Sequence, residues 1–85
     1  MKRIAVIGAI LEKPEVCQAE FNEVVSDFKG LVKGRMGLPF DKAEMAVISL
    51  TVTGTVDEIN TLNGKLGRIP NVTVKTAISN AEIAE

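Results

Sequence analysis

The sequence predicts an α+β domain whose elements follow the order β-α-β-β-α-β. Three observations carry this prediction: a complete helix-to-strand unit over residues 55–76, an alternating apolar run directly before it, and a strand–helix pair at the start of the chain. The 85 residues are enough for one domain. In the expected ferredoxin-like arrangement, two helices cover one face of a four-stranded antiparallel sheet.

The first strand is expected over residues 3–11, which are apolar on both alternating faces. Such a strand is usually central in its sheet. One alternating set is Ile4, Val6 and Ile10, and the other is Ala5, Ile7, Ala9 and Leu11. Pro14 suits the first turn of the helix that follows, which we expect to end at Lys29 and Gly30.

The two middle strands differ in strength. Residues 31–38 form a weak strand, because Gly34 and Gly37 lower β propensity and indicate a sheet edge, a bulge or the close approach of another backbone. Residues 39–44 form a turn. Residues 45–53 alternate cleanly and predict a strand with one apolar face.

The second helix has the clearest boundaries. Thr55 is the expected N-cap, and Glu58 follows at the spacing of a reciprocal capping box. Gly67 is expected to end the helix in the left-handed conformation. A strand follows from Val72, so residues 1–78 form the domain and residues 79–85 a polar C-terminal tail, frayed or a single helical turn.

This arrangement leaves one face of the sheet without helices. We expect it to be small, apolar and rich in hydroxyl groups, and such a patch usually marks a subunit contact. We therefore expect a homo-oligomer, a dimer or tetramer, formed through this open face. The residues assigned to it are Ala5, Ile7, Ala9, Val47, Ser49, Thr51, Thr73 and Ala77.

Composition narrows the chemistry. The formal charge is −1 and histidine is missing, which argues against direct nucleic-acid binding and against histidine-based catalysis or metal binding. The lone Cys17 is expected to be a buried, inert thiol. No apolar run is long enough for a membrane span, so we expect a cytoplasmic protein. We assign no catalytic residue, metal ligand or cofactor.

Two basic residues invite a functional reading. Lys65 follows Gly64, but the pair lies inside a predicted helix and Leu66 replaces the hydroxyl residue that a phosphate-binding loop needs. Arg35 lies beside Gly37 on the weak strand. It could hold an anion or a partner's carboxylate, or it could be an exposed strand charge.

Several segments together resemble one family. Arg35-x-Gly37-x-Pro39 is followed by MAVI at residues 45–48, GKLG at residues 64–67 and VxVKT at residues 72–76. In this order and spacing they resemble small proteins described as iron-only hydrogenase system regulators. The resemblance implies an ACT-like ferredoxin fold, similar to the C-terminal domain of the nickel-responsive repressor, and self-association. This chain has no ribbon-helix-helix segment before its first strand and no histidine, so neither that repressor's DNA binding nor its nickel site carries over.

The resemblance also implies where a ligand would bind. In ACT-like proteins, ligands lie at subunit interfaces near the loop after the first strand. Here that loop leads into a helix N-terminus that favours anions. The expected contacts for a small anionic metabolite are Lys13, Pro14, Glu15, Arg35 and Gly37. The functional hypothesis is a non-enzymatic regulatory module with such a ligand, and the alternative is a structural interaction subunit without one.

Overall fold

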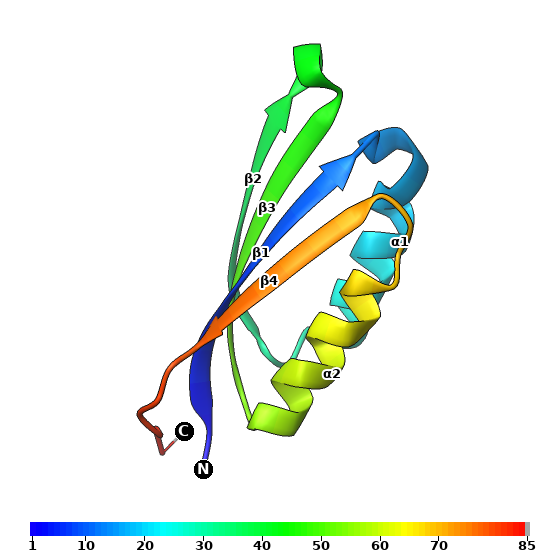
Figure 1. The fold of residues 1–85 in the computed structure, drawn as a ribbon. Coiled ribbons are helices and arrows are strands. Elements are labelled where there is room, and N and C mark those ends of the chain that lie inside the picture. The colour runs from blue at the N-terminus through cyan, green and yellow to red at the C-terminus, as the bar shows by residue number, and fades with distance from the viewer. Residues whose placement is uncertain (85) are drawn as a thin grey trace.

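The chain folds as the sequence predicts, into a four-stranded antiparallel sheet with two helices on one face (Figure 1). The computed structural model describes residues 1–84. In these residues the sheet order is β2-β3-β1-β4, so β1 and β3 are central and β2 and β4 are edges. The elements are β1 (Arg3–Glu12), α1 (Pro14–Asp27), β2 (Val32–Phe40), the 3-10 helix η1 (Asp41–Ala43), β3 (Met45–Gly54), α2 (Val56–Gly67) and β4 (Val72–Ile78).

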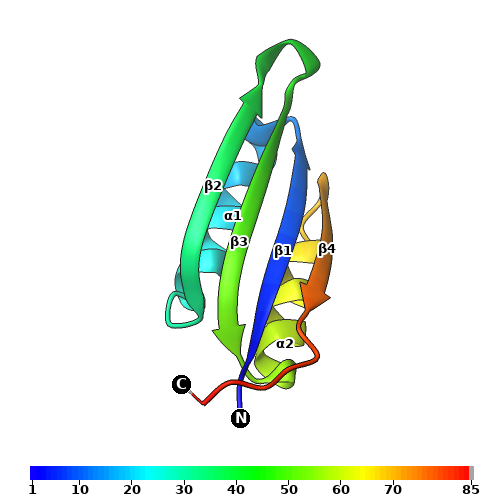
Figure 2. The ribbon, with the colours of Figure 1, turned by 90° about the vertical axis from the view of Figure 1, so that its left-hand side faces the viewer.

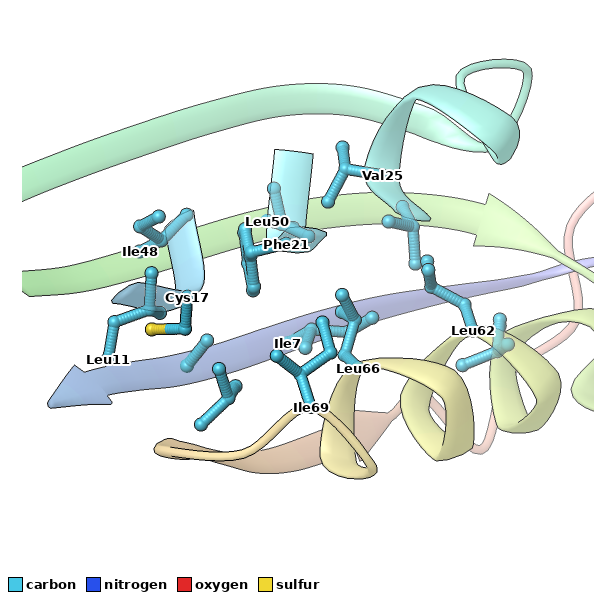
Figure 3. Close-up of a cluster of buried hydrophobic side chains, with 14 of the residues drawn as sticks. Ile7, Leu11, Cys17, Phe21, Val25, Ile48, Leu50, Leu62, Leu66 and Ile69 are labelled. Carbon is cyan, nitrogen blue, oxygen red and sulfur yellow. The ribbon is translucent and has the colours of Figure 1, made fainter. Parts of the chain in front are cut away.

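The core lies between the helices and the inner face of the sheet (Figure 3). The two central strands contribute every second residue to it, which is the period of a strand with one covered face. Each helix contributes a stripe at helical spacing, Cys17, Phe21 and Val25 from α1 and Ile59, Leu62 and Leu66 from α2. Burial of these stripes holds the two layers together.

The predicted capping box at the start of α2 is confirmed. The Glu58 backbone N–H donates to Thr55 Oγ1 at 3.1 Å, and the Thr55 backbone N–H donates to Glu58 Oε1 at 2.8 Å. Two N-terminal donors that the helix itself cannot satisfy are thereby paired. This boundary could be predicted because the motif is local.

α2 ends at Gly67 as predicted, but the left-handed conformation expected at this residue is wrong. No glycine in residues 1–84 has a positive φ, and Gly67 is still helical, with Arg68 as the C-cap in the right-handed region. The left-handed residue of this connection is Asn71, at φ 71°. Gly67 instead reflects close packing, because a Cβ there would lie 3.3 Å from Val74 Cγ2.

The predicted composition of the open face is wrong for β1. Ala5, Ile7 and Ala9 are buried, whereas Ile4, Val6 and Ile10 are exposed on the side without helices. Figure 2 shows this side of the sheet in front of the two helices. Both alternating sets of this strand are apolar, so hydrophobicity alone could not decide which set faces inward. On β3 and β4 the assignment was correct: Val47 is half-buried, and Ser49, Thr51, Thr73 and Ala77 are exposed.

The first edge strand is longer than predicted. β2 continues through Pro39 and Phe40, and its pairing with β3 shifts register between Val32 and Gly34. Proline is tolerated because an edge strand has one row of backbone groups without a ladder partner. Beyond Val32 every residue of β2 is exposed, so α1 covers little of this strand.

The described part of the tail is not helical. Ile83 forms an isolated antiparallel bridge with Lys2, with backbone bonds of 2.7 and 3.1 Å. Arg3 Nη1 also donates to the carbonyl of Ser79 at 3.1 Å. These contacts bring residues 79–83 back beside the N-terminus, as Figure 2 shows.

Candidate functional site

A hollow of about 360 Å³ lies between the start of α1, the inner side of β2 and the hairpin that joins β2 to β3. Its floor is open because Gly37 has no side chain and no atom lies within 4 Å of where a Cβ would be. Its lining residues are Pro14, Gln18, Arg35, Gly37, Leu38, Pro39, Asp41, Met45, Ala46 and Ile48.

Arg35 supplies the positive charge of this hollow. Its Nη2 donates to Asn22 Oδ1 at 2.7 Å, and its guanidinium carbon lies 5.8 Å from the centre of the Phe21 ring. Both partners belong to α1, so the helix orients the side chain from one side. A guanidinium has five N–H donors. No carboxylate in residues 1–84 is paired with it, which leaves donors for an anion.

The other walls combine apolar and polar groups. Pro14, Ala46 and Ile48 supply apolar surface, and Gln18 brings an amide one helical turn after Pro14. The Asp41 carboxylate also lines the hollow. An anion would therefore be attracted at the Arg35 end and repelled at the Asp41 end, which favours a single orientation.

The structure brings together three of the five predicted contacts. Pro14, Arg35 and Gly37 line the same hollow. Glu15 lines a smaller adjoining hollow of about 270 Å³ with Asp41 and Glu44, and Lys13 lines a third, of about 320 Å³, at the end of the sheet.

Lys13 has a structural role of its own. It is the N-cap of α1, has φ 53°, and no side chain caps the helix there. Its backbone N–H donates to the carbonyl of Glu44 at 2.8 Å, and Glu44 also has a positive φ, 55°. Together with Asn71, these residues line one hollow and are the non-glycine residues of the described chain with positive φ. Left-handed backbone thus shapes three neighbouring connections, at a steric cost to each residue.

Cys17 is buried in the core, where Figure 3 shows its sulfur beside Leu11. Burial raises the pKa of its thiol, and the charges of Glu15 and Glu20 add to this, whereas a backbone hydrogen bond lowers it. Its Sγ lies 3.7 Å from the carbonyl oxygen of Glu12. The side chain is therefore held as a neutral thiol within the core. In residues 1–84 no cluster of three or more Cys, Asp and Glu has the geometry of a metal site.

Three residues of the site escaped prediction for different reasons. Gln18 is four residues after Pro14, and this helical spacing could have indicated it. Asp41 lines the hollow because the hairpin between β2 and β3 places it there. Asn22 orients Arg35 across 13 positions of sequence. No sequence pattern specifies the tertiary contacts of Asp41 and Asn22.

The fold and the hollow define a small ferredoxin-like domain with a recess beside an edge strand, lined by one cation, Arg35, and one carboxylate residue, Asp41. Residues 3–76 match the family described as "TM1266-like: Iron-only hydrogenase system regulator, putative". The chain belongs to this family, as the GKLG and VxVKT segments predicted.

One solved structure extends this likeness to three dimensions. The uncharacterized protein TM1266 from Thermotoga maritima is 33% identical, with a TM-score of 0.88 over 92% of this chain and 98% of that chain. No curated protein matches the sequence. No helix within residues 1–84 has the length and apolar character to cross a membrane.

Proposed function

We propose that this protein is a non-enzymatic regulatory module of an iron-only hydrogenase system, acting on transcription or maturation. In this proposal it self-associates through its open sheet face and binds a small anionic metabolite in the hollow beside Arg35. The family supports the regulatory role. The observation that carries the ligand is Arg35 itself, a guanidinium oriented by Asn22 and Phe21 on the wall of a recess.

The geometry favours an anion with an apolar part. A carboxylate or phosphate could accept two parallel hydrogen bonds from the guanidinium, which is stronger than a single neutral bond. The apolar remainder would lie over Gly37 and against Ile48. The recess lies on the helical side of β2, so the copy packed on the open face does not cover it. Because β2 is an edge strand, a further copy that contacts this edge would close the recess and place the ligand at a subunit boundary.

A thermal-shift screen tests the ligand. The probes are acetate, longer carboxylic acids, amino acids, nucleotides and inorganic phosphate, applied to the wild type, Arg35→Ala and Lys42→Ala. Lys42 is an exposed cation outside the lining of this hollow and serves as the matched control. A ligand at 100 times its Kd adds about 2.7 kcal/mol, a rise in Tm of about 10 °C or more for a domain of this size.

The expected pattern is stabilisation of the wild type and Lys42→Ala and none of Arg35→Ala. Equal stabilisation of all three proteins would exclude Arg35 from the site. If no probe stabilises the wild type, the result favours the alternative hypothesis, a structural interaction subunit without a ligand. The exposed apolar face of the sheet supports self-association, which both hypotheses share.

The regulatory proposal has its own test in the source organism. Deleting the gene should change hydrogenase transcript levels if the module acts on transcription. It should change only the fraction of active enzyme if the module acts on maturation. Unchanged transcripts together with unchanged activity would contradict both.

A further inference from the structure

Gly8 lies in the middle of a central strand, and nothing within the chain requires a glycine there. Its φ is not positive, and a Cβ would meet only the Lys75 carbonyl oxygen, at 4.0 Å. A glycine inside a strand weakens it, and often marks a place where another molecule approaches closely. Gly8 is exposed on the open face, so a group that contacts it closely comes from outside the chain.

The open face is hollowed at this point. A recess of about 280 Å³ has Gly8 at its base and is bounded by Ile10, Val47, Thr73 and Lys75. The same open face carries large exposed apolar side chains outside this recess. Of these, Met36 is 63% exposed and Val6 is 48% exposed.

The strand register places Gly8 and Met36 in one row across the sheet. Ser49 pairs with Met36 on one side and with Gly8 on the other, and Gly8 pairs with Lys75. Met36 and Gly8 are thus two strands apart, about 10 Å, with Ser49 midway between them. A two-fold axis above Ser49 and parallel to β3 exchanges these two positions.

We propose that two copies of this chain pack open face to open face about that axis, with Met36 of each copy seated over Gly8 of the other. This inference rests on the proposed self-association and specifies its geometry. One rotation satisfies both contacts, as an isologous interface requires. It also places Lys75 beyond the partner's edge strand, where its charge stays in solvent.

The area buried between the two copies is compatible with a dimer. Three strands of each sheet overlap in this arrangement, and β1 and β3 have 10 residues each. At about 4.8 Å between strands and 3.3 Å per residue, the overlap is about 500 Å² per copy. The total of about 1,000 Å² meets the minimum that a biological interface should bury, below the standard size of about 1,600 Å². The net charge of −1 adds little repulsion between copies.

Exchanging the two side chains tests the pairing. Gly8→Met fills the recess, Met36→Gly removes the side chain that enters it, and the double variant restores the pair with the roles reversed. The control is Gly64→Met, which adds the same side chain to α2, on the helical side of the sheet and also in open space. Sedimentation velocity over a dilution series measures the Kd, and far-ultraviolet circular dichroism verifies folding.

Gly8→Met is expected to raise the Kd at least about 100-fold, because two symmetry-related sites are overpacked. Met36→Gly should also raise it, the double variant should recover most of the affinity, and the control should match the wild type. If the wild type is monomeric throughout, both the self-association and this geometry are overturned. If it associates but Met36→Gly and any folded Gly8→Met do so equally well, only this geometry is overturned. Weakened single variants without recovery in the double variant exclude the pairing of Met36 with Gly8.

Discussion

The two faces of β1 are both apolar, and they differ in what covers them. The residues on the covered face are at most 1% exposed, whereas the large residues on the open face are 42–48% exposed. The covered set is Ala5, Ile7, Ala9 and Leu11, and the large open residues are Ile4, Val6 and Ile10. The covered set belongs to the same buried cluster as Phe21 of α1 and Leu66 of α2. The hydrophobicity of a strand residue therefore says little about which side is buried, and contact with the helices decides.

Two adjacent residues on opposite faces give the sharpest test of this difference. Ile7 is 0% exposed, and Ile7→Ala should lower the free energy of unfolding by about 2–5 kcal/mol through lost burial and a cavity. Val6→Ala should lower it by less than about 1 kcal/mol, because nearly half of that side chain already contacts water in the monomer. Urea unfolding of dilute, monomeric protein measures both values. Equal losses would show that both faces are covered in the monomer.

Two glycines of α2 test how closely this helix packs against the sheet. Gly67→Val should destabilise by about 1–3 kcal/mol, since even its Cβ would lie 3.3 Å from the stiff Val74 side chain. The matched change is Gly64→Ala, where no atom lies within 4 Å of the new Cβ. That variant should gain up to about 1 kcal/mol from helix propensity. Thermal unfolding compares them, and a Gly67→Val protein as stable as the wild type would contradict the close packing.

The sequence predicted features that depend on local spacing and missed those that depend on tertiary contacts. Thr55 and Glu58 form a capping box within four residues, so the start of α2 could be predicted. The same helix also ends at the predicted Gly67, but its conformation there could not be predicted, because Gly67 is specified by its close contact with Val74 on a different element. The order of the elements predicted the fold, since few topologies accommodate it.

The candidate site shows the same division. Arg35 and Gly37 stand out in sequence as a cation and a glycine on a weak strand. Their role depends on two residues of α1: Asn22, which orients Arg35, and Gln18, which lines the hollow. The inward set of β1 was assigned wrongly because both sets are apolar. Only the register Ala9 with Ile48 and Ile10 with Val47 shows which side meets the helices.

The smallest expected effect is at the N-terminus of α2, where Glu58 caps the helix. A hydrogen bond from the Thr55 backbone lowers the pKa of this carboxyl below its ordinary value of 4.5, and the Thr55 side chain adds to the effect. The unfolded chain therefore binds the proton more readily, so the stabilisation is fully present above pH 4.5 and is lost as the pH falls through the lower, folded pKa.

Glu58→Gln isolates this contribution, because glutamine also completes a capping box but does not titrate. The difference in unfolding free energy between the wild type and Glu58→Gln should be present at pH 7 and shrink progressively below pH 4.5, while other carboxyls cancel in the subtraction. Thr55→Ala is the positive control and should cost about 1 kcal/mol at pH 7 by removing the N-cap acceptor. Denaturant unfolding from pH 7 to pH 3 measures these differences. A wild-type advantage that stays constant over this range would mean that the Glu58 charge does not stabilise the helix start, and that the cap acts through its geometry alone.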